Sequence, residues 1–239
     1  MLEYIAFTEG RRRRGENQDR VFVNNRVLKD GCITGKDLNV IAAVVCDGVS
    51  GTHGGDIAAQ MTAASFRGIN VGESSGRRIA AHLRKVNKRI LLRQDESEIR
   101  RDMASTVAGL FIYGSTYMAF NLGDSRVYEF YEEKLNLCTR DHIIKIPKED
   151  GGEDYALTGY LGYNKGIRSP TIKRGNIRAG SQFFLLCSDG VYKNIKEEDM
   201  VRILKNRDTL KEKKEAIVQL CLQNGFPDDM SLIIIRSVS

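Results

Sequence analysis

The chain has 239 residues, of which 41% are apolar and 28% are charged, and its net charge is +6. This composition is typical of a soluble globular protein long enough for one large core, and no apolar run reaches the roughly 18 residues of a membrane-spanning helix. The N-terminus lacks the basic-then-apolar order of a signal peptide, so we expect a cytoplasmic protein. The positive charge suits either nucleic acid or phosphorylated partners and does not separate these classes.

Turn residues between apolar runs predict strands, and apolar residues at helical spacing predict helices. In chain order, strands are predicted at residues 2–7, 20–23 and 40–46, helices at 56–66 and 77–94, strands at 105–113, 116–122, 125–131, 134–138 and 182–187, helices at 196–205 and 208–223, and a last strand at 230–238. The short turns between the middle strands imply antiparallel hairpins. This order predicts antiparallel sheets packed together and covered by helices, in one domain spanning residues 1–239.

Cysteine and histidine are not expected to supply a metal site. The three histidines, His53, His82 and His142, are scattered and form no metalloprotease pattern. The cysteines are odd in number and widely separated, which argues against a disulfide framework or a zinc site. The five cysteines are Cys32, Cys46, Cys138, Cys187 and Cys221.

Apolar strands that run directly into an aspartate recur along the chain. The clearest cases are Asp47 and Asp189, each followed by glycine, and weaker ones are Asp19, Asp124 and Asp228. A strand end can hold a carboxylate rigidly, and carboxylate and carbonyl oxygens suit Mg²⁺ or Mn²⁺. A single Asp-Gly pair is more often a turn than a metal ligand. A cluster of such carboxylates implies bound cations or raised pKa values, unless the residues do not converge.

Short motifs follow one another in a fixed order. They are Arg14 to Asp19 (RGENQD), Asp47 to Gly51 (DGVSG), Ser105-Thr106, Gly123 to Arg126 (GDSR), Leu161-Gly162 with Pro170, Ser188 to Gly190 (SDG) and Asp228 to Ser231 (DDMS). In this order they resemble the elements of the type 2C, metal-dependent serine/threonine protein phosphatase family, over nearly the whole chain. The resemblance implies an α+β fold, an αββα sandwich of two antiparallel sheets flanked by helix layers, in a bacterial-like catalytic domain.

The resemblance also implies roles for individual residues. Asp47 would bridge two Mn²⁺ or Mg²⁺ ions, and Gly48 would give its carbonyl oxygen to one of them. Asp189 and Asp228 would complete the shell of the other ion. Arg14 would clamp the substrate phosphate, because a planar guanidinium binds phosphate oxygens in pairs. The reaction would then be attack of a metal-activated water on phosphorus, without a covalent enzyme intermediate.

Supporting residues and departures from the family pattern complete the expected site. Asp19 would support the ligands or their waters, and Asp124 would bind a third, weaker ion. Gln18 stands where the family often has glutamate, so one carboxylate is missing. Val49 stands where many eukaryotic members have a histidine that is a proposed general acid, and we do not assign that role to His53.

These observations predict metal-dependent hydrolysis of phosphoserine and phosphothreonine in proteins by a monomer that binds neither nucleic acid nor membrane, with a cognate Ser/Thr kinase as a plausible partner. The alternative is a pseudophosphatase, a phosphoprotein-binding module with the same fold, for which Gln18 leaves room. An aspartyl-nucleophile phosphatase is disfavoured because it needs an aspartate at position 49. A nucleic-acid-binding protein is disfavoured because its motifs are missing.

Some segments have no assigned role. Arg11 to Arg13 are not explained by catalysis, and the basic face of the helix at 77–94 is either solvated or a partner surface. Residues 155–163 are either a mobile flap near the site or a surface loop. Asp141-His142 indicates a turn or a structural hydrogen bond.

Overall fold

The computed structural model describes residues 1–10, 16–49, 51–96, 102–147, 153–178, 182–225 and 228–238. Arg14 and the basic residues Arg11 to Arg13 therefore lie outside the described residues. Within the described residues the strands form two six-stranded sheets and one two-stranded sheet. Their paired strands are antiparallel, as the short turns predicted.

The first large sheet has the order β4 (Gly31–Asp37), β1 (Leu2–Glu9), β14 (Met230–Ser237), β13 (Phe183–Cys187), β8 (Arg126–Tyr131) and β9 (Lys134–Leu137). The second has the order β12 (Thr171–Asn176), β7 (Thr116–Leu122), β6 (Val107–Tyr113), β5 (Val40–Cys46), β2 (Arg20–Val23) and β3 (Arg26–Leu28). The small sheet pairs β10 (Ile143–Pro147) with β11 (Glu153–Leu157).

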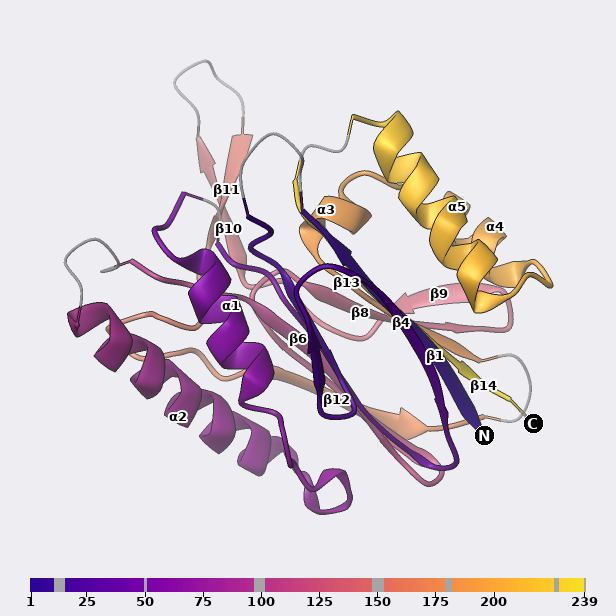
Figure 1. The fold of residues 1–239 in the computed structure, drawn as a ribbon, viewed down its shortest axis with the longest axis horizontal. Helices are drawn as coiled ribbons and strands as arrows, with labels where there is room; N and C mark the ends of the chain where they lie inside the picture. Colours follow the sequence, from indigo (N-terminus) through magenta and orange to yellow (C-terminus); the bar gives the residue numbers. More distant parts are fainter. Residues whose placement is uncertain are drawn as a thin grey trace.

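The helices form the outer layers. They are α1 (Gly55–Ala64), α2 (Gly76–Asp95), α3 (Asp189–Tyr192), α4 (Glu197–Lys205) and α5 (Leu210–Gln223), with a 3₁₀ turn, η1 (Val71–Glu73). Figure 1 shows α1 and α2 on one side of the stacked sheets and α4 and α5 on the other. This is the αββα sandwich that the resemblance predicted.

The core lies in layers because strand residues alternate between the two faces of each sheet. In β14, Ile233 and Ile235 pack into the space between the sheets, whereas Leu232 and Ile234 pack against α4 and α5. Both faces of the central strands are therefore buried. This is the reason why these strands appear in the sequence as continuous apolar runs.

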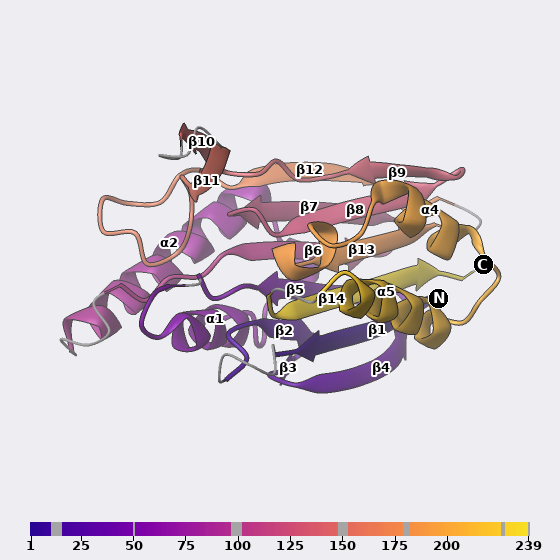
Figure 2. The same cartoon turned by 90° about the horizontal axis from the view of Figure 1, so that it is seen from above.

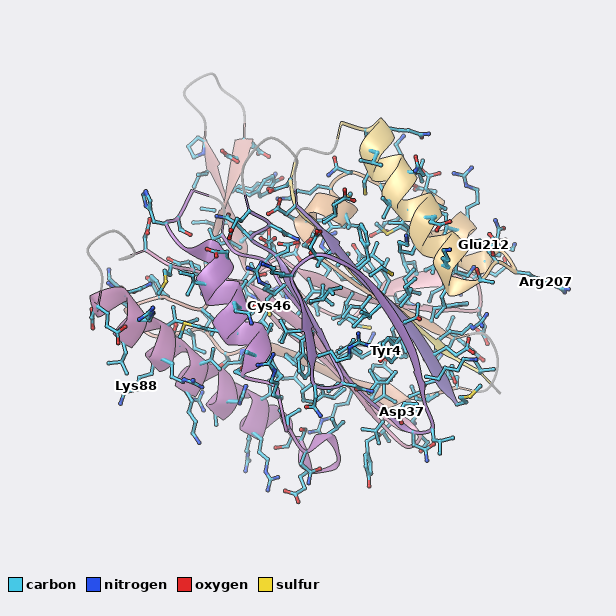
Figure 3. All side chains as sticks on the ribbon, in the orientation of Figure 1. Tyr4, Asp37, Cys46, Lys88, Arg207 and Glu212 are labelled. Atoms are coloured by element: carbon cyan, nitrogen blue, oxygen red, sulfur yellow. The ribbon has the colours of Figure 1, made fainter. Side chains whose placement is uncertain are left out.

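The outer layer of α1 and α2 rests on an aromatic cluster. Phe66, just after α1, contacts Phe22, Phe111 and Phe120 of the second sheet, with ring centroids about 6 Å apart. The opposite face of α2 is exposed, and Lys88 on that face points away from the sheets in Figure 3. The helix holds seven basic residues and one acidic residue, a net charge of +6 that equals the charge of the whole chain.

The layer formed by α4 and α5 contains a buried lysine that caps the C-terminus of the neighbouring helix. Lys213 of α5 is 0% exposed, and its ammonium group donates to the carbonyl oxygens of Ile203, Leu204 and Asn206 at 2.7–3.0 Å. The last carbonyls of an α-helix have no partner inside the helix. The Lys213 ammonium therefore satisfies the C-terminus of α4 and joins α4 to α5.

Replacing Lys213 with methionine is expected to lower the free energy of unfolding by about 2–4 kcal/mol, because buried carbonyls lose a charged donor. Urea unfolding of the variant measures this change. Lys211→Met, on the exposed side of the same helix, is the matched control and should change stability little. Equal stability of the two variants would contradict this assignment.

The structure also differs from the predicted elements at several places. It adds β3, β4, β10, β11 and α3, which were not predicted, whereas β12 begins directly after Pro170, where the resemblance implied the strand that follows the flap. The β2–β3 turn uses Asn24 and Asn25, both with positive φ, a hairpin signal that had been overlooked. Among the described residues, no helix combines the length and the apolar character needed to cross a membrane.

Candidate functional site

Four of the strand-end aspartates meet at one cavity. Asp47 follows β5, Asp124 precedes β8, Asp189 opens α3 directly after β13, and Asp228 precedes β14. All four line a cavity of about 600 Å³. Figure 3 labels Cys46, the last residue of β5 and the neighbour of Asp47. Because β5 belongs to one large sheet and β13 and β14 to the other, the cavity lies where the ends of the two sheets meet.

Thr106 fixes the backbone of Asp47 from both sides. The Asp47 backbone N–H donates to Thr106 Oγ1 at 3.2 Å, and the Thr106 N–H donates to the Asp47 carbonyl at 2.8 Å. The Thr106 hydroxyl also shares a 2.7 Å hydrogen bond with the buried Ser125 hydroxyl. The Ser-Thr and GDSR motifs therefore meet here and hold the backbone of Asp47 in a fixed place.

Two glycines allow close backbone contacts around the aspartates. A Cβ on Gly48 would lie 2.5 Å from the carbonyl carbon of Gly55, so no side chain fits between β5 and α1. A Cβ on Gly190 would lie 2.0 Å from the backbone oxygen of Asp229. The start of α3 is thus pressed against the segment before β14, which brings Asp189 and Asp228 to one cavity.

The carboxylates perturb one another. Burial raises the pKa of Asp47 well above its usual value, and the charges of Asp19, Asp189 and other nearby aspartates raise it further. Burial also raises the pKa of Asp19, although the hydroxyls of Ser231 and Ser188 act in the opposite direction. Such mutual repulsion is expected of a site that gathers negative charge without a counterion.

The aspartate Asp19 indicates how the site would accept a cation. Its side chain is 1% exposed, and its Oδ2 atom has no hydrogen-bond partner within the described parts of the chain. A buried carboxylate oxygen without a donor is costly, and a cation or a water bound to one would satisfy it. The available metal ligands are carboxylate oxygens and the Gly48 carbonyl oxygen, which suit Mg²⁺ or Mn²⁺ rather than zinc.

The carboxylates line the cavity without forming a closed cage. Across the described ranges, no group of three acidic, histidine or cysteine side chains is arranged to hold an ion as it stands. Like charges about 4 Å apart repel by roughly 4 kcal/mol at an effective dielectric near 20, which favours separation of the side chains without cations. A site for two ions about 3.5–4 Å apart also needs ligands spread around two centres.

Asp124 has a different environment from the other aspartates. Its Oδ2 atom accepts a hydrogen bond from the Tyr192 hydroxyl at 3.4 Å and lies 3.8 Å from the Lys193 ammonium. Burial and the charge of Asp189 raise the pKa of Asp124 to about 6, while Lys193 lowers it. Lys193 was missed in the sequence, because its spacing of four residues from Asp189 indicates an ion pair only in a helical turn, and the helix α3 was not predicted.

The segment with the N-terminal motif is tied to the segment before β14. The Gln18 backbone N–H donates to Asp229 Oδ2 at 2.7 Å, across 211 residues of sequence. The Asn17 side chain accepts from the Asp19 N–H and donates to Thr8 and to the Lys29 carbonyl. Asp229 and Asn17 thus position this segment. The predicted phosphate clamp, Arg14, lies outside the described residues.

The segment at residues 155–163 contributes a wall of the cavity. Tyr155, Leu157, Tyr160 and Tyr163 line it together with the aspartates. The strands β10 and β11 stand away from the large sheets (Figures 1 and 2). This placement favours the flap over the surface loop.

The loop after β11 is anchored to α2. Asn87 accepts a hydrogen bond from the Gly162 N–H at 2.7 Å, and Gln94 donates to the Gly162 carbonyl.

The histidines take no place in the cavity wall. His53 is exposed and pairs with Asp102, which agrees with leaving it out of the mechanism. The ring of His142 bonds to the backbone of Gly123, and Asp141 forms a two-point ion pair with Arg126. The prediction of a structural hydrogen bond at Asp141-His142 is confirmed.

Comparison with known proteins identifies protein phosphatases as relatives of this chain. Residues 11–223 match the sequence model of the family described as protein phosphatase 2C. The serine/threonine protein phosphatase PstP of Mycobacterium tuberculosis is 23% identical over 249 residues, covering 98% of this chain and 45% of the relative. This chain therefore spans less than half the length of PstP. The serine/threonine phosphatase stp of Listeria monocytogenes is 27% identical over 224 residues, covering 86% of this chain and 88% of that protein.

A solved structure has the same fold. The catalytic domain of PstP, in complex with two manganese ions, superposes with a TM-score of 0.78 at 21% identity and full coverage of both chains. At this identity the likeness concerns the fold alone. The manganese ions belong to that structure.

Proposed function

Because this chain belongs to the protein phosphatase 2C family, we propose that it hydrolyses phosphoserine and phosphothreonine in proteins at a site for two Mn²⁺ or Mg²⁺ ions. The observation that carries the proposal is the meeting of Asp47, Asp189 and Asp228 at one cavity. These residues come from β-strand ends in two different sheets, and their mutual repulsion is unfavourable unless cations are bound.

The proposed ligands are those that the family resemblance implies, and the position of the three aspartates at one cavity supports them. Asp47 would serve both ions, the Gly48 carbonyl would bind one of them, and Asp189 and Asp228 would bind the other. Asp19 would support the ligands or their bound waters through its Oδ2 atom, which has no hydrogen-bond partner among the described residues. When bound, two such ions lower the pKa of a shared water and neutralise charge on the phosphoryl oxygens.

The chain itself supplies rigidity, shape and substrate contacts. Thr106 keeps Asp47 from moving toward or away from its partners, since it bonds to both sides of the Asp47 backbone. The tyrosines of the flap give the cavity an apolar wall against which the residues beside the phosphorylated side chain can pack. Arg14 clamps the phosphate in this proposal. The substrates of the enzyme are phosphorylated proteins, including those of a cognate Ser/Thr kinase. Residues 1–239 act as one catalytic domain, and the enzyme is a monomer.

The decisive experiment measures phosphate release from a phosphoserine peptide with Mn²⁺, after EDTA, and after Mn²⁺ is restored. We expect activity with Mn²⁺, loss with EDTA and recovery on restoration. A phosphotyrosine peptide of the same sequence is the control for substrate class and should be hydrolysed more slowly. Activity that survives EDTA would refute the metal mechanism. Tight binding of the phosphopeptide without hydrolysis would instead support the pseudophosphatase.

A further inference from the structure

The ammonium group of Lys193 lies between two carboxylates at the cavity. Its Nζ atom is 2.7 Å from Asp189 Oδ2 and 3.8 Å from Asp124 Oδ2. The Lys193 side chain is 54% exposed and lines the cavity, whereas the side chains of Asp124 and Asp189 are 12% and 20% exposed. A positive charge therefore already occupies the position between Asp124 and the aspartate assigned to the two-ion site.

Local contacts hold Lys193 within reach of both carboxylates. Asp189 opens α3 and Lys193 directly follows its last residue in helical backbone conformation, so their side chains, four residues apart, lie on one side of this turn. The Lys193 N–H donates to the Asp189 carbonyl at 3.0 Å. The neighbouring Tyr192 donates its hydroxyl to Asp124. The Arg126 guanidinium lies 3.7 Å from the centre of the Tyr192 ring and holds that side chain in place.

We propose that the Lys193 ammonium takes the place of a third divalent ion beside Asp124, so that this enzyme binds two ions and carries a fixed monovalent cation as the third positive charge. The inference rests on the proposed two-ion site and concerns its stoichiometry. A divalent ion bound to Asp124 would lie close to the ammonium and be repelled by it. The ammonium also lies 3.8 Å from Asp124 Oδ2, an oxygen that such an ion would need.

Lys193 is a positioning residue in this proposal. It neutralises Asp124 and restrains Asp189, and both effects persist whether or not substrate is present. The alternative is that Lys193 leaves Asp189 and binds a phosphoryl oxygen of the substrate. The two roles differ in metal stoichiometry, which only the first role changes.

The test is the number of Mn²⁺ ions bound, measured by equilibrium dialysis and by isothermal titration calorimetry. We expect two ions for the wild-type chain and three for Lys193→Met, the third weaker than the others. Asp124→Asn in the Lys193→Met background should return the number to two, because the third ion loses its ligand. Lys193→Arg keeps the positive charge and should also bind two.

The matched control is Lys196→Met, which removes an exposed lysine three residues further along and should bind two ions like the wild type. Two ions for Lys193→Met, with a raised KM for the phosphopeptide, would overturn the proposal in favour of a substrate contact. Three ions in the wild-type chain would also overturn it, and this measurement needs no variant to fold. If the wild-type chain binds no Mn²⁺, the proposed function itself has failed.

Discussion

Replacing Asp47 with asparagine is expected to lower kcat/KM for a phosphoserine peptide about 10³-fold or more. The Asp47 carboxylate is the group assigned to both ions, and an amide has one oxygen and no negative charge to offer them. The backbone bonds to Thr106 do not involve this side chain, so the local fold should persist. The loss should appear in kcat as well as in the Mn²⁺ concentration needed for half-maximal activity.

Initial rates over a range of peptide and Mn²⁺ concentrations measure both quantities. Asp30→Asn, an exposed aspartate in a turn away from the cavity, is the control and should leave kcat/KM unchanged. Activity of Asp47→Asn within tenfold of the wild type would show that Asp47 does not bridge the ions. A loss that excess Mn²⁺ fully reverses would place Asp47 at the edge of the site.

The same substitution is expected to stabilise the chain when metal is absent. Burial and the neighbouring carboxylates raise the pKa of Asp47, so ionised Asp47 is unfavourable in the folded state. Asparagine removes that charge without changing the size of the side chain. In EDTA at pH 7.5 we expect a Tm about 4 °C or more above that of the wild type, which corresponds to about 1–2 kcal/mol for a chain of this length.

The stability of the metal-free chain is expected to fall as the pH rises, for the following reason. A carboxyl group with a raised pKa binds its proton more tightly in the folded state than in the unfolded state, where its pKa is about 4. Its contribution to stability is complete below that value and is lost as the pH rises through the folded pKa. Asp124 has a raised pKa of about 6 and adds to the same loss between about pH 4 and pH 6.

Thermal unfolding in EDTA from pH 4.5 to pH 7.5 should therefore show a growing difference in Tm between Asp47→Asn and the wild type. Added Mn²⁺ should reverse the order, because the ions bind the folded wild-type chain more tightly. A lower Tm for Asp47→Asn in EDTA at pH 7.5 would contradict the electrostatic account of the site.

The central strands were predicted from sequence, whereas some of the partly exposed edge strands were not. The strands at 20–23, 40–46 and 116–122 have the predicted bounds, because each is an apolar run between clear turns. The edge strands β3 and β4 were not predicted, whereas the edge strand β9 was predicted from the turn that joins it to β8. An edge strand has one neighbour and is partly exposed, so its sequence lacks a continuous apolar run.

The site was predictable where one residue stands at the end of an apolar strand. Asp47 and Asp189 were identified by that pattern alone, and the structure brings both to the cavity. The contacts that position them were not predictable, because they join distant segments. Thr106 is hydrogen-bonded to Asp47, 59 residues away in the sequence, and Asp229 is hydrogen-bonded to Gln18, 211 residues away. Lys193 was missed because the short helix α3, which brings it beside Asp189, was not predicted.

The charge on α2 gives the molecule an electric dipole. The other parts of the sequence sum to zero charge, so the positive end of this dipole lies on the side of the second sheet (Figure 2). Gln94, near the C-terminal end of α2, lines the cavity, so this end of the charged helix lies beside the site. An acidic protein within about 10 Å, the screening length at 0.1 M salt, is turned toward α2 before contact. Raising the ionic strength shortens the screening length and weakens this orientation.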